Sequence, residues 1–512
     1  MPKWPSDPRR WIIGKETGIY LLKGKVGMAA KPRSRTRVEK DSLGRRTLPA
    51  SAYYGIQTQR AIENFPISGL RAPAVFVKTC ARIKKAAALA NARLQLLDRR
   101  RASAIASACD EIEAGKHAGE FVVDVFQMGA GTSFHMNVNE VIANRAEELL
   151  GGRKGNYRLV HPNDHVNMAQ STNDVYPTAI RLAALELVRG RLLPALLGLE
   201  RSLTRKARAF DRILKSGRTH LQDAVPIRLG QEFAAYAVAV GKSRASIMSA
   251  SRSLHELGIG GSAVGTGLNT HPRFAGLVVR RLAADTDLPL ALAKDPREAM
   301  QSLRPFADLS AALRNLALEL NRISNDLRLL ASGPRTGLAE ISLPPVAPGS
   351  SIMPGKVNPS ILEMLNQVCY QVMGCDLAVS AAVQAGQLEL NVMMPVVSFN
   401  LLFMIEILAN AVRQVGALAI DGIRADAERC SAFAQSSLGL ATALSPLIGY
   451  AAAAAIAGES LRTGKSIVAI VRERGLLDKK ALERIFDPLA MTEPGIPALK
   501  KGKPARSRGR GR

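Results

Sequence analysis

Five long segments of the chain carry apolar residues at helical spacing. They span residues 177–212, 228–257, 297–332, 358–385 and 396–422. In the third segment, steps of four and three residues alternate over three heptads, at Leu309, Leu313, Leu316, Leu320, Ile323, Leu327 and Leu330. Because such steps place side chains on one face of a helix, this pattern predicts a helix with a continuous hydrophobic seam. Gly333 and Pro334 are expected to end it.

The length of these segments predicts the architecture. A helix of roughly 30 residues is about 45 Å long, which favours a bundle whose seams also pack against other subunits. The flanking regions carry shorter helical patterns with frequent turn residues. We therefore expect a mainly α protein with an N-terminal domain (37–172), a central helical bundle (173–427) and a small helical C-terminal domain (428–496).

Composition supports a helical protein of the cytoplasm. Aromatic residues make up only 4% of the chain, and an abundance of Ala and Leu favours helices. The five cysteines form no C-x-x-C pair, so neither a zinc site nor a disulfide framework is indicated. No apolar run approaches the roughly 18–20 residues of a membrane span. We expect a cytoplasmic protein without a membrane segment.

About half of the net charge of +27 lies at the two ends of the chain. Residues 1–36 and residues 497–512 each carry a net charge of +7, and their composition is typical of disordered tails. A second methionine, Met28, is an alternative start of translation, so translation of residues 1–27 is left open. Binding of nucleic acid is therefore not indicated for the protein as a whole, apart from non-specific binding by a tail.

Four polar segments stand beside expected helix ends, at residues 129–140, 161–178, 217–232 and 347–360. Each alone has an ordinary explanation as a helix cap or a turn. The last, "APGSSIMPGKVNPS", is not a phosphate-binding loop, because Gly349 to Gly355 is one residue too long and Val357 replaces the required hydroxyl. Together the segments offer hydroxyls, amides and a lysine but no metal-ligand cluster, which suits a small dicarboxylate.

These segments resemble the aspartase/fumarase superfamily. "GSSIMPGKVNP" is similar to its signature, and "AYYGIQTQRAIENFPISG", "GAGTS", "HPNDHVN", "QSTNDVYPT", "GRTHLQDAVPIRLGQEF", "GGSAVGTGLN" and "AGQLELNV" follow in family order over roughly residues 37–495. The resemblance implies a three-domain fold in a homotetramer, whose five-helix domains form a twenty-helix core. It also implies active sites shared by three subunits, and elimination across a Cα–Cβ bond that releases fumarate without an organic cofactor. Activation by a divalent cation is left open, and no metal ligand is assigned.

The resemblance also assigns roles to individual residues. Ser350, on a mobile loop, is similar to the base that removes the Cβ proton, with Lys356 as the nearby cation. His220 corresponds to a site histidine and Glu363 to the acid paired with it. Positions similar to substrate-binding ones are Thr132, Ser171, Thr172, Asn173, Thr219, Ser351 and Asn358, with Arg60 as a further candidate for the α-carboxylate. His161, Asn163 and Asp164 correspond to an accessory dicarboxylate site.

The sequence leans toward the branch of the family that releases ammonia from L-aspartate. "YYG" at residues 53–55, Ala130, His165 and "AGQLELN" all resemble that branch. The alternative is a class II fumarate hydratase, which interconverts L-malate and fumarate. A third, less favoured hypothesis is a catalytically idle relative with a structural or nucleic-acid-binding role. Departures from the family pattern include His135 in place of Asn, Met168-Ala169 in place of Lys-Ser, and Met394 in place of an acid.

Overall fold

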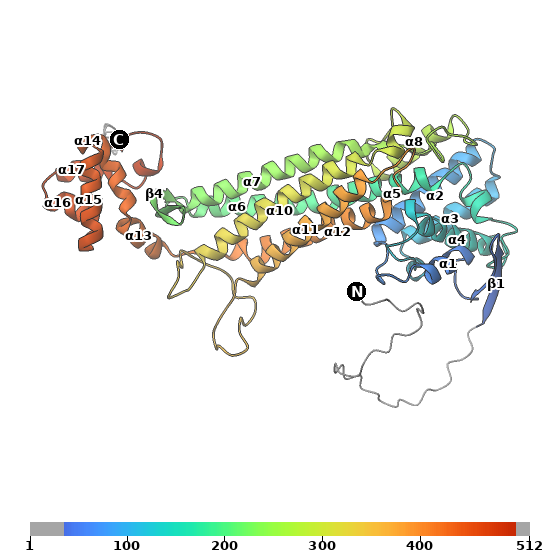
Figure 1. The fold of residues 1–512 in the computed structure, drawn as a ribbon, viewed down its shortest axis with the longest axis horizontal. Coiled ribbons are helices and arrows are strands. Elements are labelled where there is room, and N and C mark those ends of the chain that lie inside the picture. Colours follow the sequence, from blue (N-terminus) through green and yellow to red (C-terminus); the bar gives the residue numbers. More distant parts are fainter. Residues whose placement is uncertain (1–34, 498–512) are drawn as a thin grey trace, which may run out of the picture.

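The computed structural model describes residues 35–497. The molecule is elongated, with an N-terminal domain at one end, a long helical bundle in the middle and a small helical domain at the other end (Figure 1). It is mainly helical, as the sequence predicts. The basic segments expected at residues 1–36 and 497–512 lie almost entirely outside the described residues.

The N-terminal domain packs short helices around alanine-rich helix α2. A two-stranded antiparallel sheet of β1 (Thr36–Asp41) and β2 (Gly44–Pro49) precedes α1 (Ile56–Asn64), α2 (Ala74–Arg93), α3 (Arg99–Glu113) and α4 (Thr132–Leu149). Five of the seven alanines of α2 are buried. Small side chains let neighbouring helices approach closely, and the core continues from this domain into the bundle without a break.

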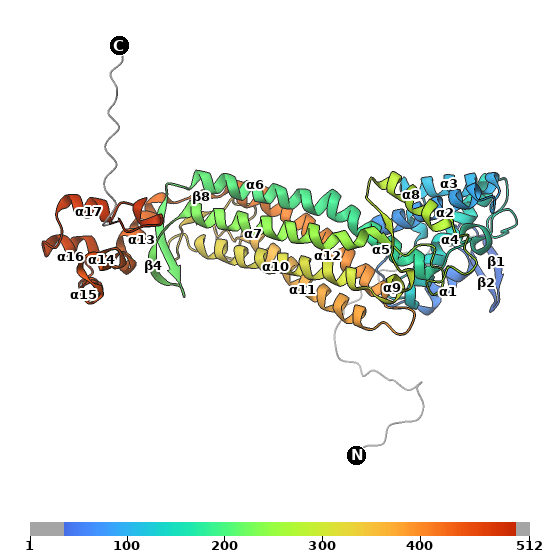
Figure 2. The same ribbon diagram turned by 90° about the horizontal axis from the view of Figure 1, so that it is seen from above.

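The bundle consists of five long helical segments that run side by side (Figure 2). The first combines α5 (Thr172–Leu187) and α6 (Leu193–Ala209), and the others are α7 (Leu229–Ala250), α10 (Arg304–Leu330), α11 (Ser360–Gln384) and α12 (Met394–Leu418). All seven residues of the seam predicted in α10 are buried. The five long helices expected from the sequence are thus confirmed.

Two of the expected helices are interrupted at prolines. The segment predicted at 297–332 divides into α9 (Pro296–Gln301) and α10, because Pro305 occupies the first turn of a new helix. Between α5 and α6, residues Val188–Leu192 form one π-helical turn. Pro194 follows it and lacks the N–H that a regular helix would use, so the wider turn absorbs the missing hydrogen bond.

Short strands and small helices connect the bundle to its ends. The hairpin of β3 (Leu214–Thr219) and β4 (Gln222–Arg228) joins α6 to α7. The parallel pair β5 (Glu256–Leu257) and β6 (Ala291–Leu292) brackets α8 (Phe274–Thr286). The antiparallel pair β7 (Ile341–Ser342) and β8 (Arg424–Ala425) ties the segment after α10 to the segment after α12.

The C-terminal domain has a hydrophobic core of its own. It contains α13 (Ala427–Ser436), α14 (Ser445–Ile448), α15 (Tyr450–Thr463), α16 (Ile467–Glu473) and α17 (Lys479–Ile485). Its buried apolar residues, between Leu440 and Ile485, form a cluster separate from the main core. Among the described residues, one segment, Met394–Gly422, is long and apolar enough to cross a membrane by composition. It is α12 and its extension, and 61% of its most apolar window is buried inside the protein.

Candidate active site

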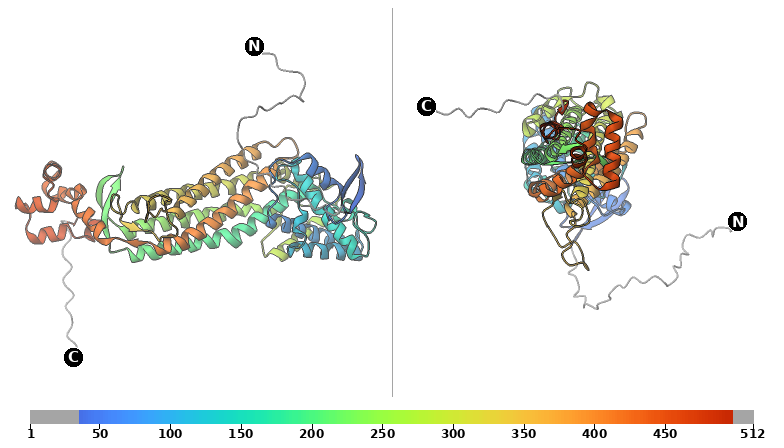
Figure 3. Two further views of the ribbon diagram at one scale, coloured as in Figure 1. Left: turned by 90° about the horizontal axis from the view of Figure 1, so that it is seen from below. Right: turned by 90° about the vertical axis from the view of Figure 1, so that its left-hand side faces the viewer.

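The elements that carry the predicted site residues lie at the two opposite ends of the bundle (Figures 1 and 3). Thr132 and the Ser171–Asn173 segment lie at the end next to the N-terminal domain, where α4 and α5 begin. Thr219 and the 343–359 loop lie at the end next to the C-terminal domain. A helix of 27 residues such as α10 is about 40 Å long, so one chain does not bring the two groups together.

At the first end, α5 begins with a fully formed capping box. The hydroxyl of Ser171 accepts a hydrogen bond from the backbone N–H of Asn173 at 3.2 Å, and the N–H of Ser171 donates to Asp174 Oδ1 at 2.9 Å. The second oxygen of Asp174 accepts from the backbone N–H groups of Gly260 and Ser262 at 2.9 and 3.1 Å. The cap therefore ties the 260–269 segment to the start of α5, with several polar groups at one helix N-terminus.

A chain of buried polar groups lies directly behind this helix start. Lys84 Nζ is 2.6 Å from His135 Nε2, and His135 Nδ1 is 2.7 Å from the hydroxyl oxygen of Thr172. Burial lowers the pKa of Lys84 to about 7. It also lowers the pKa of His135 well below the ordinary value, so the imidazole is neutral. Nothing in the sequence pattern indicates a role for Lys84, and His135 stands out there only as a departure from the family pattern.

The accessory segment forms a single π-helical turn, Pro162–Val166. His161 caps it, since its Nδ1 accepts the backbone N–H groups of Asn163 and Asp164, both at 3.3 Å. Asn163 and Asp164 are exposed. The three residues predicted for the accessory site are thus close together, while their role in binding stays a prediction.

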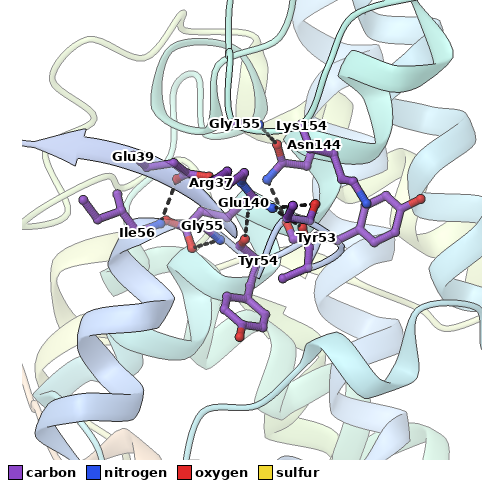
Figure 4. A network of polar contacts seen from close by, with 12 residues as sticks. Arg37, Glu39, Tyr53, Tyr54, Gly55, Ile56, Glu140, Asn144, Lys154 and Gly155 are labelled. Atoms are coloured by element: carbon purple, nitrogen blue, oxygen red, sulfur yellow. Dashed lines mark hydrogen bonds and ion pairs between the residues drawn. The ribbon is translucent and has the colours of Figure 1, made fainter. Parts of the chain in front are cut away.

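Buried carboxylates hold the backbone of the "YYG" segment (Figure 4). Glu140 accepts hydrogen bonds from the backbone N–H groups of Gly55, Gln57 and Thr58 and from the Thr58 hydroxyl, at 2.6–3.1 Å. Burial raises the pKa of Glu140 to about 7, against the opposing effect of these donors. The nearby Arg60 makes two 2.7 Å hydrogen bonds to Asp41. Its guanidinium is therefore engaged within the N-terminal domain, and its predicted contact with substrate would require it to leave Asp41.

At the opposite end, the β3–β4 hairpin presents Thr219 and His220 to solvent. The two-residue turn is formed by His220 and Leu221, with φ angles of 55° and 58°. Only primed turns match the twist of a hairpin, and they favour Gly or Asn at positive φ. Two large residues in this conformation carry local backbone strain, a feature common at functional sites.

A buried charge cluster supports the base of this hairpin. Glu340 is completely buried, and its carboxylate lies 2.8 Å from Arg218 Nη1 and 3.1 Å from Lys215 Nζ. Lys215 also donates to Glu232 at 2.7 Å. Because Glu340 directly precedes β7 and the 343–359 loop, the cluster joins the two segments that carry predicted site residues at this end.

The 343–359 loop carries Ser350 in a tight turn. Its Oγ accepts hydrogen bonds from the backbone N–H groups of Ile352 at 3.2 Å and Met353 at 2.9 Å. The stem is closed by Gly349 N–H to the carbonyl of Lys356 at 2.7 Å and by Asn358 Nδ2 to the carbonyl of Gly349 at 2.7 Å. Ser351 and Lys356 are exposed. Two backbone donors aimed at one hydroxyl oxygen favour negative charge on that oxygen.

The predicted pair of His220 and Glu363 is not formed inside one chain. Glu363 lies in the first turn of α11, and no hydrogen bond or ion pair joins it to His220 within the described part of the chain. Across residues 35–497, no group of three His, Cys, Asp or Glu side chains is placed to hold a metal ion. The roles predicted for individual residues remain predictions.

The chain matches two family models over most of its length. A family model described as lyase matches residues 44–374, and a model of the fumarase C C-terminus matches residues 440–493. An aspartate ammonia-lyase of Bacillus subtilis is 48% identical over 90% of this chain and 97% of its own length. A class II fumarate hydratase of Halobacterium salinarum is 49% identical over 90% of this chain and 98% of its own length.

A solved structure has the same fold. The fumarate lyase:delta crystallin structure from Brucella melitensis, bound to cobalt, is 47% identical and superposes with a TM-score of 0.86. The match covers 90% of this chain and all of the other. The similarity therefore extends through all three regions of the molecule, including both ends of the bundle.

Proposed function

The chain belongs to the lyase family that these matches define, and from this premise we propose that it is an aspartate ammonia-lyase. The observation that carries the proposal is its 45–48% identity to several aspartate ammonia-lyases over 90–91% of its length. The geometry of the Ser350 loop supports the same reaction class. The enzyme is thus a carbon–nitrogen lyase that converts L-aspartate to fumarate and ammonia.

The proposed mechanism begins with proton removal from Cβ by the Ser350 alkoxide. The N–H groups of Ile352 and Met353 stabilise that alkoxide before the reaction, and Lys356 supplies positive charge. Abstraction leaves a carboxylate with two negative charges spread over its oxygens, which the site must bind more tightly than the substrate. The electron pair left by the Cβ–H bond then forms the Cα–Cβ double bond while the C–N bond breaks. The two electrons of the C–N bond leave with the nitrogen of the substrate's ammonium group, which departs as ammonia and takes up the proton that Ser350 releases.

The proposal includes a homotetramer with active sites shared by three subunits. It is supported by the separation of the polar groups to opposite ends of a bundle about 40 Å long. If neighbouring chains run antiparallel, the end of one bundle next to its N-terminal domain lies beside the end of another bundle next to its C-terminal domain. Thr132, Ser171, Thr172 and Asn173 of one chain would then face Thr219, His220, Ser350, Ser351, Lys356 and Asn358 of others.

We also propose a cytoplasmic enzyme that needs no organic cofactor. All five cysteines are free and buried, which fits a reducing compartment. The elimination uses only acid–base and electrostatic groups supplied by side chains and backbone. Whether a divalent cation activates the enzyme is decided by assays with and without a chelator.

The first test is the ultraviolet absorbance of fumarate, measured with purified protein given L-aspartate in one cuvette and L-malate in another. Absorbance that rises with aspartate alone establishes the ammonia-lyase. A rise with malate alone assigns the chain to the hydratase branch, the second candidate, which the 49% identity to the Halobacterium salinarum enzyme favours. If the absorbance rises in neither cuvette, both assignments are rejected.

The role of Ser350 is tested by substitution. We expect Ser350→Ala to keep its oligomeric mass and its unfolding temperature but to lose turnover by roughly 10²–10⁴-fold, the usual contribution of a general base. Ser342→Ala, in β7 outside the loop, is the matched control and keeps full turnover. Substantial turnover in the Ser350 variant would show that another group removes the proton.

A further inference from the structure

Three helices of the N-terminal half contribute to one buried line of hydrogen bonds. Lys84 on α2, His135 on α4 and Thr172 on α5 follow one another at 2.6 and 2.7 Å. Their exposed fractions are 0%, 2% and 8%, so only Thr172 reaches toward the surface. A buried polar network of this kind is rigid when every member is satisfied.

The direction of each hydrogen bond in this line follows from the protonated form of Lys84. Lys84 also donates to Asn167 Oδ1 at 2.8 Å, while the amide nitrogen of Asn167 donates to the carbonyl of Gln170. In its ammonium form, which is populated at and below its pKa of about 7, Lys84 has donors only, so His135 Nε2 then accepts from it. The neutral imidazole then carries its single proton on Nδ1, and this N–H donates to the oxygen of Thr172.

This polarity leaves the hydroxyl hydrogen of Thr172 free to donate elsewhere. Thr172 is the first residue of α5, between Ser171 and Asn173, where the helix N-terminus also favours an anion. We propose that His135 is a positioning residue, which holds the Thr172 hydroxyl as a donor to one carboxylate of the dicarboxylate substrate. The inference rests on the proposed function for the substrate class alone, and His135 itself does not touch the substrate.

Two substitutions of His135 distinguish the effect of hydrogen-bond direction from the effect of packing. In His135→Asn, the side-chain amide offers an acceptor to Lys84 and a donor to Thr172, so the direction of the line is retained. In His135→Leu, both hydrogen bonds are lost and Thr172 is free to turn. We expect the Leu variant to raise KM by about tenfold or more, as the loss of one hydrogen bond to a charged group does. Its kcat should stay within about threefold, and the Asn variant should keep both constants within about threefold.

Succinate, a dicarboxylate that cannot eliminate, reports binding without chemistry. Its competitive inhibition constant should rise in His135→Leu and in Thr172→Val by similar factors. The double variant should be no worse than Thr172→Val alone, because residues that act as one unit are not additive. Asn139→Leu is the matched control: Asn139 is buried one turn along α4, and no hydrogen bond joins it to Lys84 or Thr172.

Several outcomes would overturn the inference. Equal effects of Asn and Leu at position 135, additive effects in the double variant, or a fall in kcat at constant KM would each do so. If His135→Leu fails to fold, ¹⁵N-histidine NMR spectra of the wild-type enzyme show which ring nitrogen of His135 carries the proton. The resonance that disappears in His135→Asn should show a protonated Nδ1, and a protonated Nε2 would refute the proposed polarity. The kinetic assays use whichever of aspartate or malate is turned over, so a wrong choice of substrate does not affect them.

Discussion

Carboxylates buried in the N-terminal domain mostly serve to hold loops. Glu147 accepts from the backbone N–H groups of Leu159 and Val160, and Asp124 accepts from those of Ser68 and Gly69. Each such carboxylate satisfies N–H groups that no regular element pairs, which removes a large desolvation cost. The two carboxylates thereby hold the segments at residues 68–69 and 159–160 against the rest of the domain.

Glu111 gives this domain a specific sensitivity to acid. The Arg145 guanidinium, at 2.7 and 2.9 Å, lowers the pKa of Glu111 to about 2 from an ordinary value of 4.5. A carboxyl with a depressed pKa contributes stability that is complete above pH 4.5 and is lost as the pH falls through about 2. We therefore expect Glu111→Gln to unfold at a lower temperature than wild type at pH 7.

The difference between the two unfolding temperatures should shrink as the pH is lowered from 4.5 toward 2. Glu483→Gln, at an exposed position of α17, serves as the control and should follow wild type at every pH. A constant difference across the titration would mean that Gln disturbs packing rather than charge.

At this scale the sequence revealed the chemical types but not the partners. Hydroxyls and amides near helix starts were visible because capping has a local signature, as at Ser171. The sequence did not indicate the line of hydrogen bonds through Lys84 and His135, because its members lie 51 and 37 residues apart. A single lysine in a helical pattern also carries no sign that it is buried. Pairing of distant side chains follows from the packing of helices, which a local pattern does not specify.

At the scale of elements, the β3–β4 hairpin depends on the charge cluster beneath it. Glu340 receives Arg218 and Lys215 from β3, while its backbone carbonyl accepts the N–H of Asp426 at 2.9 Å. One residue thus connects the hairpin, the start of the 343–359 loop and the approach to α13. Two strained turn residues, His220 and Leu221, are held in place by this base.

Glu340→Gln should therefore loosen this end of the molecule. Removing one member of a buried ion-pair cluster leaves Lys215 and Arg218 undercompensated, at a cost of about 3–5 kcal/mol in unfolding free energy. Glu473→Gln, which breaks the exposed pair with Lys465, is the control and should cost much less, because water screens an exposed pair. Denaturant unfolding measures both, and equal losses would show that the buried cluster adds no specific stability.

The helices themselves were the most predictable elements. The seam of α10 was read correctly from Leu309 to Leu330, because steps of four and three residues have few other structural solutions. The break before Pro305 and the π turn before Pro194 were not anticipated. A proline at a helix start and a proline inside a helix look alike until the neighbouring helices are placed.

For the whole molecule, the arrangement of the two ends makes a prediction about mixed assemblies. Ser350→Ala and Asn173→Ala alter opposite ends of the bundle and should each be inactive alone. If every site takes these residues from different chains, subunits mixed at random in equal amounts regain about one quarter of wild-type turnover, since two independent halves must both be intact. Denaturing and renaturing the two variants together, then measuring fumarate release, tests this. A matched mixture of Ser350→Ala and Lys356→Ala, both on one loop, should regain nothing, and equal recovery in the two mixtures would contradict sites shared across the bundle.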